Sequence, residues 1–160
     1  MTTKHIFTLF ALLAATTSAF AQGQLNFQNK AQVEVTVRDE STGAVTTELR
    51  DADLVKPGEV VVFTSTFTNI GEETADEILV NNPVPENMVY TPFSARGEST
   101  VVNYSVDGST FASPDRLVVV DNDGVERTAR PEEYKEIQWV FDGELAPGES
   151  GQVSFKARLL

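Results

Sequence analysis

Apolar and polar residues alternate along much of the chain after residue 30. In residues 31–38, Val33, Val35 and Val37 alternate with polar or charged neighbours. Side chains of a β-strand point to opposite faces in turn, so this period of two predicts a strand with one buried face. We expect the three valines to form that buried face, and we expect residues 22–30 to be a polar segment that precedes the strand.

The longest alternating segment covers residues 59–69 (EVVVFTSTFTN). Valine and threonine dominate it, and β-branched side chains suit the pleated surface of a strand. One predicted face carries Val61, Phe63, Ser65 and Phe67, and the other carries Val60, Val62, Thr64, Thr66 and Thr68.

Two further alternating segments lie near the C-terminus. Residues 137–141 place Ile137, Trp139 and Phe141 on one face, and residues 151–159 carry an apolar side chain at every second position. Because its two neighbours on the same face are apolar, we expect Trp139 to fill the core. The alternative is an exposed platform on which a sugar ring stacks.

Shorter segments typical of strands complete the pattern, at residues 44–50, 77–80, 88–93, 100–106 and 116–120. Residues 107–108 (DG) and 122–124 (NDG) are typical of hairpin turns. The strand at 77–80 is expected to stop at Asn81, because Pro83 and Pro85 interrupt ladder pairing. Residues 128–136 are the least strand-like part, and Pro131 predicts a helical turn there.

About eight strands at short, regular spacing, without a long amphipathic helix, favour a β-sandwich over a parallel α/β sheet. We therefore predict an all-β protein with an immunoglobulin-like antiparallel β-sandwich of about seven to eight strands. Residues 22–160 are a suitable length for one such domain.

The first 21 residues have the pattern of a secretory signal peptide. Lys4 and His5 form a basic start, residues 6–15 are apolar, and residues 19–21 (AFA) form a small-x-small cleavage site. The apolar run is shorter than the roughly 20 residues that a membrane-spanning helix needs. The segment predicts export, to the periplasm or the extracellular space, and no membrane span in the rest of the chain.

Composition narrows the chemistry that the chain can perform. His5, inside the predicted signal peptide, is the single histidine, and the chain has no cysteine. These counts exclude Ser-His-Asp and Cys-His nucleophiles and zinc sites built from His or Cys after residue 21. The formal net charge of −12 disfavours nucleic acid and anionic lipid as partners. We predict no catalytic residue, no cofactor and no metal-ligand set.

Two acidic clusters leave a cation site open as an alternative. They are Asp121, Asp123 and Glu126 around Gly124, and Glu72, Glu73, Asp76 and Glu77. If Gly124 took the sixth position of an EF-hand loop, Val119 and Arg130 would stand at the first and last ligand positions, which excludes that motif. A hairpin turn and a solvated acidic loop are the simpler interpretations, with weak calcium binding as the alternative.

Three stretches resemble the bacterial conserved repeat domain family, also called domain of unknown function 11. They are residues 55–71 (VKPGEVVVFTSTFTNIG), 81–90 (NNPVPENMVY) and 139–159 (WVFDGELAPGESGQVSFKARL). The resemblance covers one copy, over residues 55–159, and implies an immunoglobulin-like sandwich in an exported or surface protein. It brings no catalytic residues, and its motif residues imply architectural roles, namely Pro57, Gly58, Asn69, Gly71, Pro147 and Gly148.

Together these features predict an exported, non-catalytic module with a structural or protein–protein interaction role in the bacterial cell envelope. Its expected partner is another envelope protein, which could pair with an exposed sheet edge. A calcium-binding surface or adhesion module is the alternative. A carboxylate-dependent hydrolase is the third reading, because acidic side chains can act in pairs in glycoside hydrolysis.

Overall fold

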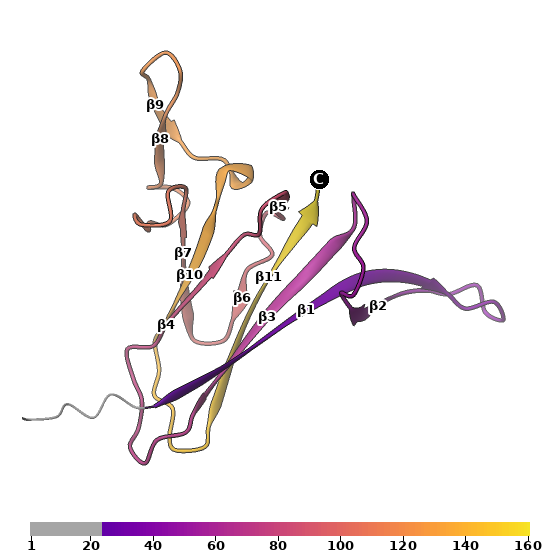
Figure 1. Cartoon of the computed structure of the whole chain (residues 1–160), viewed down its shortest axis with the longest axis horizontal. Coiled ribbons are helices and arrows are strands. Elements are labelled where there is room, and N and C mark those ends of the chain that lie inside the picture. Colours follow the sequence, from indigo (N-terminus) through magenta and orange to yellow (C-terminus); the bar gives the residue numbers. More distant parts are fainter. Residues whose placement is uncertain (1–23) are drawn as a thin grey trace, which may run out of the picture.

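The computed structural model describes residues 24–160, so the predicted signal peptide and its cleavage site lie outside the described residues. Within this range the chain forms eleven strands and one 3₁₀ turn, and no α-helix (Figure 1). The elements are β1 (Leu25–Arg38), β2 (Val45–Asp51), β3 (Val60–Asn69), β4 (Leu79–Pro83), β5 (Met88–Tyr90), β6 (Arg96–Gly97), β7 (Thr100–Ser105), β8 (Val118–Val120), β9 (Glu126–Thr128), η1 (Pro131–Glu133), β10 (Glu136–Phe141) and β11 (Ser150–Leu159).

The strands form two packed antiparallel sheets and a separate hairpin. The first sheet has the order β2-β1-β3-β11-β5, with β6 also paired to β11, and the second has the order β4-β10-β7. Strands β8 and β9 pair only with each other. The prediction of an all-β, antiparallel sandwich is confirmed. The strand count exceeds the expected seven to eight because several strands, such as β6 and β9, are very short.

The core lies between the two sheets and is centred on Trp139, whose side chain is 0% exposed. Its ring centroid lies 6.2 Å from that of Phe155, which comes from the opposite sheet. Ile137 and Phe67 are buried in the same cluster. The prediction that Trp139 fills the core is confirmed, and the alternative of an exposed sugar platform is wrong.

Two Pro-Gly turns with the same chemistry introduce the two long central strands. Gly58 (φ +91°) precedes β3, and Gly148 (φ +82°) precedes β11. Each turn closes with a backbone hydrogen bond, from Glu59 to Lys56 and from Glu149 to Ala146. The glutamate carboxylate then accepts the N–H of the first turn residue, at 2.8 Å from Lys56 and 2.9 Å from Ala146. Proline and a positive-φ glycine are what such turns require.

Asn69 joins the end of β3 to two loops. Its side chain is fully buried, and Nδ2 donates to the carbonyls of Glu73 and Leu145 at 2.7 and 2.8 Å. Its Oδ1 accepts the N–H of Gly71 at 2.9 Å. The architectural role expected for Asn69 and Gly71 is therefore visible in their contacts, since one amide satisfies three backbone groups.

Two predicted strand limits are wrong. The strand predicted to stop at Asn81 continues through Pro83, which lies opposite Glu136. Strand β4 is an edge strand, so its outer side needs no ladder donor and tolerates a proline. The expected polar segment at 22–30 is instead the start of β1, where Leu25 pairs with Asn69 and Phe27 with Phe67.

The turn predictions have different outcomes. Residues 122–124 connect β8 to β9 as a hairpin, and Pro131 opens η1, as expected. After residues 107–108 the chain returns only far enough for a single bridge between Ala112 and Tyr104. The Asp107 carboxylate accepts backbone N–H groups of Thr110 and Ser109, and these bonds hold its pKa well below the ordinary range.

Candidate functional site

A two-stranded arm extends from the sandwich. Strand β1 pairs with β3 only from Leu25 to Val33, whereas it pairs with β2 from Gln32 to Arg38. Beyond Val33, β1 and β2 therefore leave the packed layers together, and we call residues 34–51 the arm. Figure 1 shows the arm reaching away from the rest of the first sheet. All seven residues of β2 are exposed.

The arm corrects one prediction. Val33 is buried as expected, but Val35 and Val37 are only half-buried, although they lie on the same face. The second sheet has three strands and does not extend over this part of β1. Strict alternation predicts which side chains share a face, and burial of that face depends on a covering layer that the local sequence does not specify.

Among residues 24–160, no strand pairs with the outer edge of β2, so its backbone groups are free within this range. At the two ends of the β1–β2 ladder, the N–H of Ala52 donates to the carbonyl of Ala31, and the N–H of Asp39 donates to the carbonyl of Ala44. Residues 44 and 52 therefore belong to hydrogen-bonded pairs. Because every second pair of an antiparallel ladder is hydrogen-bonded, the even-numbered residues of β2 between them also bond to β1. The odd-numbered residues direct their N–H and C=O groups away from β1; they are Val45, Thr47, Leu49 and Asp51.

The arm carries exposed charges in a defined order. Glu48 and Arg50 lie on one face and form an ion pair with 3.4 Å between the Arg50 Nη2 and Glu48 Oε2 atoms. Leu49 lies between them on the other face, with a 48% exposed side chain. At the arm's turn, Asp39 accepts hydrogen bonds from the Ser41 hydroxyl and from two backbone N–H groups, which lower its pKa to about 2.

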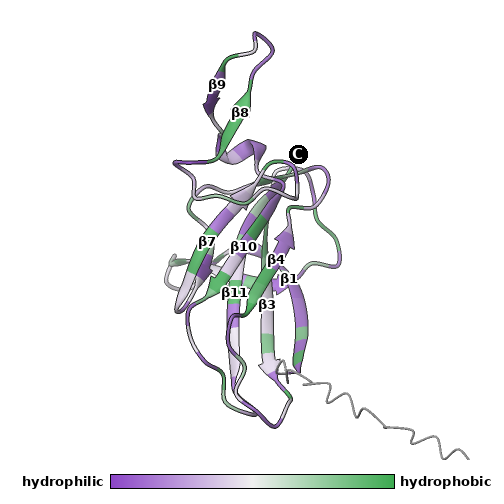
Figure 2. Cartoon of the chain, turned by 90° about the vertical axis from the view of Figure 1, so that its left-hand side faces the viewer, coloured by the Kyte–Doolittle hydropathy of each residue, from purple (hydrophilic) through white to green (hydrophobic). Residues whose placement is uncertain are grey.

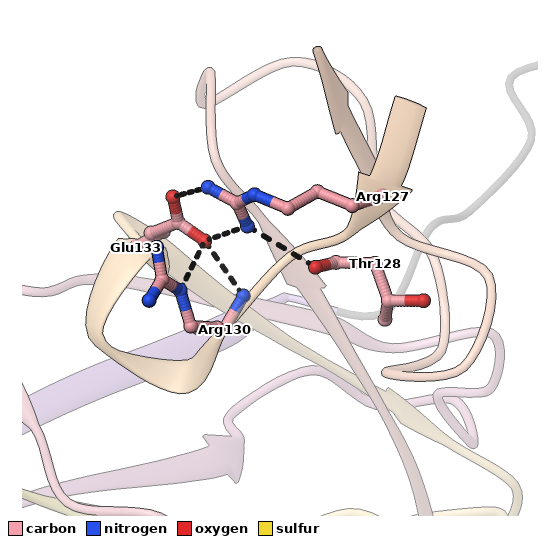
Figure 3. A network of polar contacts seen from close by, with 4 residues as sticks. All are labelled: Arg127, Thr128, Arg130 and Glu133. Carbon is pink, nitrogen blue, oxygen red and sulfur yellow. Dashed lines mark hydrogen bonds and ion pairs between the residues drawn. The ribbon is translucent and has the colours of Figure 1, made fainter. Parts of the chain in front are cut away.

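The β8–β9 hairpin is a second projection, and an ion pair ties its base to η1. The Arg127 guanidinium donates to both carboxylate oxygens of Glu133, at 2.7 and 2.6 Å, and the same carboxylate accepts the backbone N–H of Arg130 (Figure 3). Arg127 is the main cause that lowers the pKa of Glu133 to about 2. This two-pronged contact fixes the hairpin's orientation on the sandwich.

The residues considered for calcium have other contacts. The Asp121 carboxylate accepts the N–H groups of Asp123 and Val125 at 3.0 and 2.9 Å, which is ordinary hairpin-turn chemistry. The four acids of the other cluster, Glu72, Glu73, Asp76 and Glu77, are exposed. Between residues 24 and 160, no group of three or more acidic or histidine side chains is placed to hold a metal ion. Calcium binding stays a prediction.

The outer face of the second sheet carries an apolar row. Val140 of β10 lies opposite Leu79 of β4 and Val101 of β7, and both flanking side chains are exposed. Figure 2 shows this sheet from its outer side, with hydrophobic stretches on all three strands. The three side chains of the row line a shallow hollow, which the acids Asp76, Glu77, Asp142 and Glu144 also line. The row is short, and its rim is charged.

A narrow cleft of about 300 Å³ opens between the sheets beside β1 and β4. Three of its polar side chains are hydrogen-bonded to one another: Ser65 donates to Asn29 at 2.7 Å, and Asn82 donates to Ser65 at 2.9 Å. The cleft is thus occupied by a polar contact that joins the two sheets. The aromatic rings of Phe63 and Phe155, which stack with centroids 5.0 Å apart, also line it.

Three tyrosines cluster inside the sandwich. The hydroxyls of Tyr90 and Tyr104 lie 3.1 Å apart, and the Tyr104 ring stacks on Tyr134 at 4.4 Å. Burial raises the pKa of Tyr104 well above its ordinary range, and the hydrogen bond to Tyr90 adds to that shift. The three rings pack against one another in the core.

Comparison of this chain with protein-family models, with curated proteins and with solved structures gave no match. Residues 24–160 contain no helix of the length and apolar character that crossing a bilayer requires.

Proposed function

We propose that this chain is an exported, non-catalytic module of the bacterial cell envelope that acts through protein–protein contact. The observation that carries the proposal is the arm, in which β2 is exposed along its whole length and has one unpaired edge. An exposed edge is a template for a strand from another chain, and backbone hydrogen bonds then supply affinity.

The other sheet edges are less open to an added strand. In the second sheet, the β4 edge carries Pro83, and residue Ala112 bridges the outer side of β7 at Tyr104. On the far side of the first sheet, β5 and β6 are only three and two residues long. Short strands, prolines and covering loops are the usual ways in which proteins protect edges, so β2 is the preferred contact site.

Sequence chemistry supports the non-catalytic and exported parts of the proposal. His5 is the single histidine, and the chain has no cysteine. The core hydroxyls of Tyr90 and Tyr104 bond to each other, and that of Tyr90 also accepts the backbone N–H of Ala95. The signal-peptide pattern of residues 1–21 and the resemblance to the bacterial conserved repeat domain both favour an envelope location.

The test is site-specific photo-crosslinking in cells. A photoreactive residue replaces Leu49 on the outer edge of β2 or, as a matched control, Val118 on the β8–β9 hairpin; the two side chains are 48% and 49% exposed. We expect a discrete adduct with a defined envelope protein, or with a second copy of the chain, from position 49. Equal adducts from both positions, or none from position 49, would contradict the proposal.

No contact within residues 24–160 specifically favours the calcium-binding or hydrolase alternatives over this proposal. A melting curve in millimolar calcium tests the first, because a ligand that binds only the native state raises its melting temperature. Substitution of single acidic residues, with any measured turnover as readout, tests the second.

A further inference from the structure

We propose that the partner strand for β2 is β2 of a second copy of this chain, paired antiparallel across a two-fold axis at Leu49. The inference rests on the proposed function, because it uses the same edge. It adds the identity of the partner and the register of the pairing.

The backbone geometry permits this register. Leu49 and its odd-numbered neighbours direct their N–H and C=O groups outward from β2. An antiparallel pair with Leu49 opposite its symmetry mate places Thr47 opposite Asp51 of the second copy. Residues 47, 49 and 51 all direct their N–H and C=O groups away from β1, so each hydrogen-bonded pair of the new ladder joins a free donor to a free acceptor.

The charges select this register. With the axis at Leu49, Glu48 of each copy lies opposite Arg50 of the other copy, so two opposite-charge pairs form by symmetry. Directly opposed side chains of a ladder are close enough to interact, and opposite charges stabilise the pair whereas like charges destabilise it. The Glu48–Arg50 pair already present within one strand shows that both side chains lie on the same face.

The neighbouring symmetric registers fail the same criterion. A shift of the axis to Glu48 places Glu48 opposite its own mate, and a shift to Arg50 opposes the two guanidinium groups. Among the axes at residues 48, 49 and 50, only that at Leu49 gives attraction at both charged positions. The exposed Leu49 side chains then meet on the other face and are removed from water.

The position of the arm makes the pairing accessible. The arm continues past the point where β1 stops pairing with β3, and β2 is the edge strand at the opposite end of the first sheet from β5. The two sandwich bodies can therefore stay apart while the arms pair. Such a contact is small, so we expect a reversible dimer that forms over a range of about 10 μM to 1 mM.

Sedimentation velocity of the purified protein over that concentration range tests the proposal. We expect Glu48→Arg, which opposes arginines at both positions, and Arg50→Glu, which opposes glutamates, each to weaken self-association by about tenfold or more. An equimolar mixture of the two variants restores complementary charges between unlike chains and should form a heterodimer. The double variant Glu48→Arg/Arg50→Glu should also recover the dimer.

A disulfide test fixes the register. Because the chain has no cysteine, Leu49→Cys introduces a single thiol at the proposed axis, within the Cα separation that a disulfide allows. We expect oxidation to yield a covalent dimer. The control Val45→Cys, at a 61% exposed position of the same strand, lies far from its mate in this register and should stay monomeric.

A protein that stays monomeric at 1 mM (about the highest concentration that such a contact needs) would overturn the inference. So would single charge variants that dimerise like the wild type, or equal cross-linking at positions 45 and 49. If these results coincide with a position-49 adduct to a different envelope protein in cells, the dimer is wrong and the proposed function stands. If that adduct is also missing, both fail.

Discussion

The sandwich body and the arm are built from the same kinds of residues but are held together differently. In the body, Val33 and Val61 are buried, whereas Val35 and Val37 of the arm continue the same alternation and are only half-buried. The body therefore holds most of the packing free energy, and the arm holds free edge groups and exposed charges. Stability and contact are separated along one continuous strand, β1.

The largest effect is expected in the body, from Trp139→Ala. The indole is completely buried, and its N–H has no hydrogen-bond partner within residues 24–160, so its contribution comes from packing. Removing a buried aromatic ring leaves a cavity, and we expect a loss of about 3–5 kcal/mol in the free energy of unfolding. Urea denaturation measures it; a change below about 1 kcal/mol would contradict the description of the core.

Asn69→Ala should follow, because the amide satisfies three backbone groups in two loops. Leaving buried partners unsatisfied costs about 1–3 kcal/mol, and the same denaturation series measures it. Asn26→Ala is the matched control, since Asn26 is exposed on the first sheet and should change stability by less than about 0.5 kcal/mol. Equal losses for both variants would contradict the role given to Asn69.

Glu133→Gln is expected to change the pH dependence of stability. Arg127 lowers the pKa of Glu133 from 4.5 to about 2, so its stabilising effect is complete above pH 4.5 and is lost as the pH falls towards 2. The melting temperatures of wild type and variant should therefore differ most near neutral pH and converge in acid. The exposed neighbour Glu132, changed to Gln, should give no such convergence; a constant difference for Glu133→Gln would refute the ion-pair account.

The smallest effect on stability is expected in the arm. Leu49→Ala removes an exposed side chain and should change the free energy of unfolding by less than about 0.5 kcal/mol. The same variant should weaken self-association, because Leu49 lies at the proposed axis. A stability loss as large as that of a body variant would show that the arm is packed, and would remove the contrast between the two regions.

Local sequence was sufficient for the two central strands and for the turn of the β8–β9 hairpin. Alternation at 59–69 and 151–159 predicted the two central strands and their faces, and residues 122–124 predicted the hairpin turn. These features could be predicted because pleat geometry and the conformations of proline and glycine act over a few residues.

Features that depend on distant segments were not predicted. Val35 and Val37 were predicted to be buried, because their local alternation does not show whether the second sheet covers them. Pro83 looked like a strand stop, because its place in an edge strand follows from the sheet order. The order Glu48, Leu49, Arg50 could be interpreted as a pairing signal only once the structure had shown that β2 is an edge strand.

Amide hydrogen exchange along β2, measured at low and high protein concentration, tests the central claim that this edge pairs with β2 of a second copy of the chain. At low concentration the amides of Thr46, Glu48 and Arg50, which bond to β1, should exchange more slowly than those of Thr47, Leu49 and Asp51. At high concentration the second group should become protected as well. Exchange of Thr47, Leu49 and Asp51 at the same fast rate at every concentration would contradict the account.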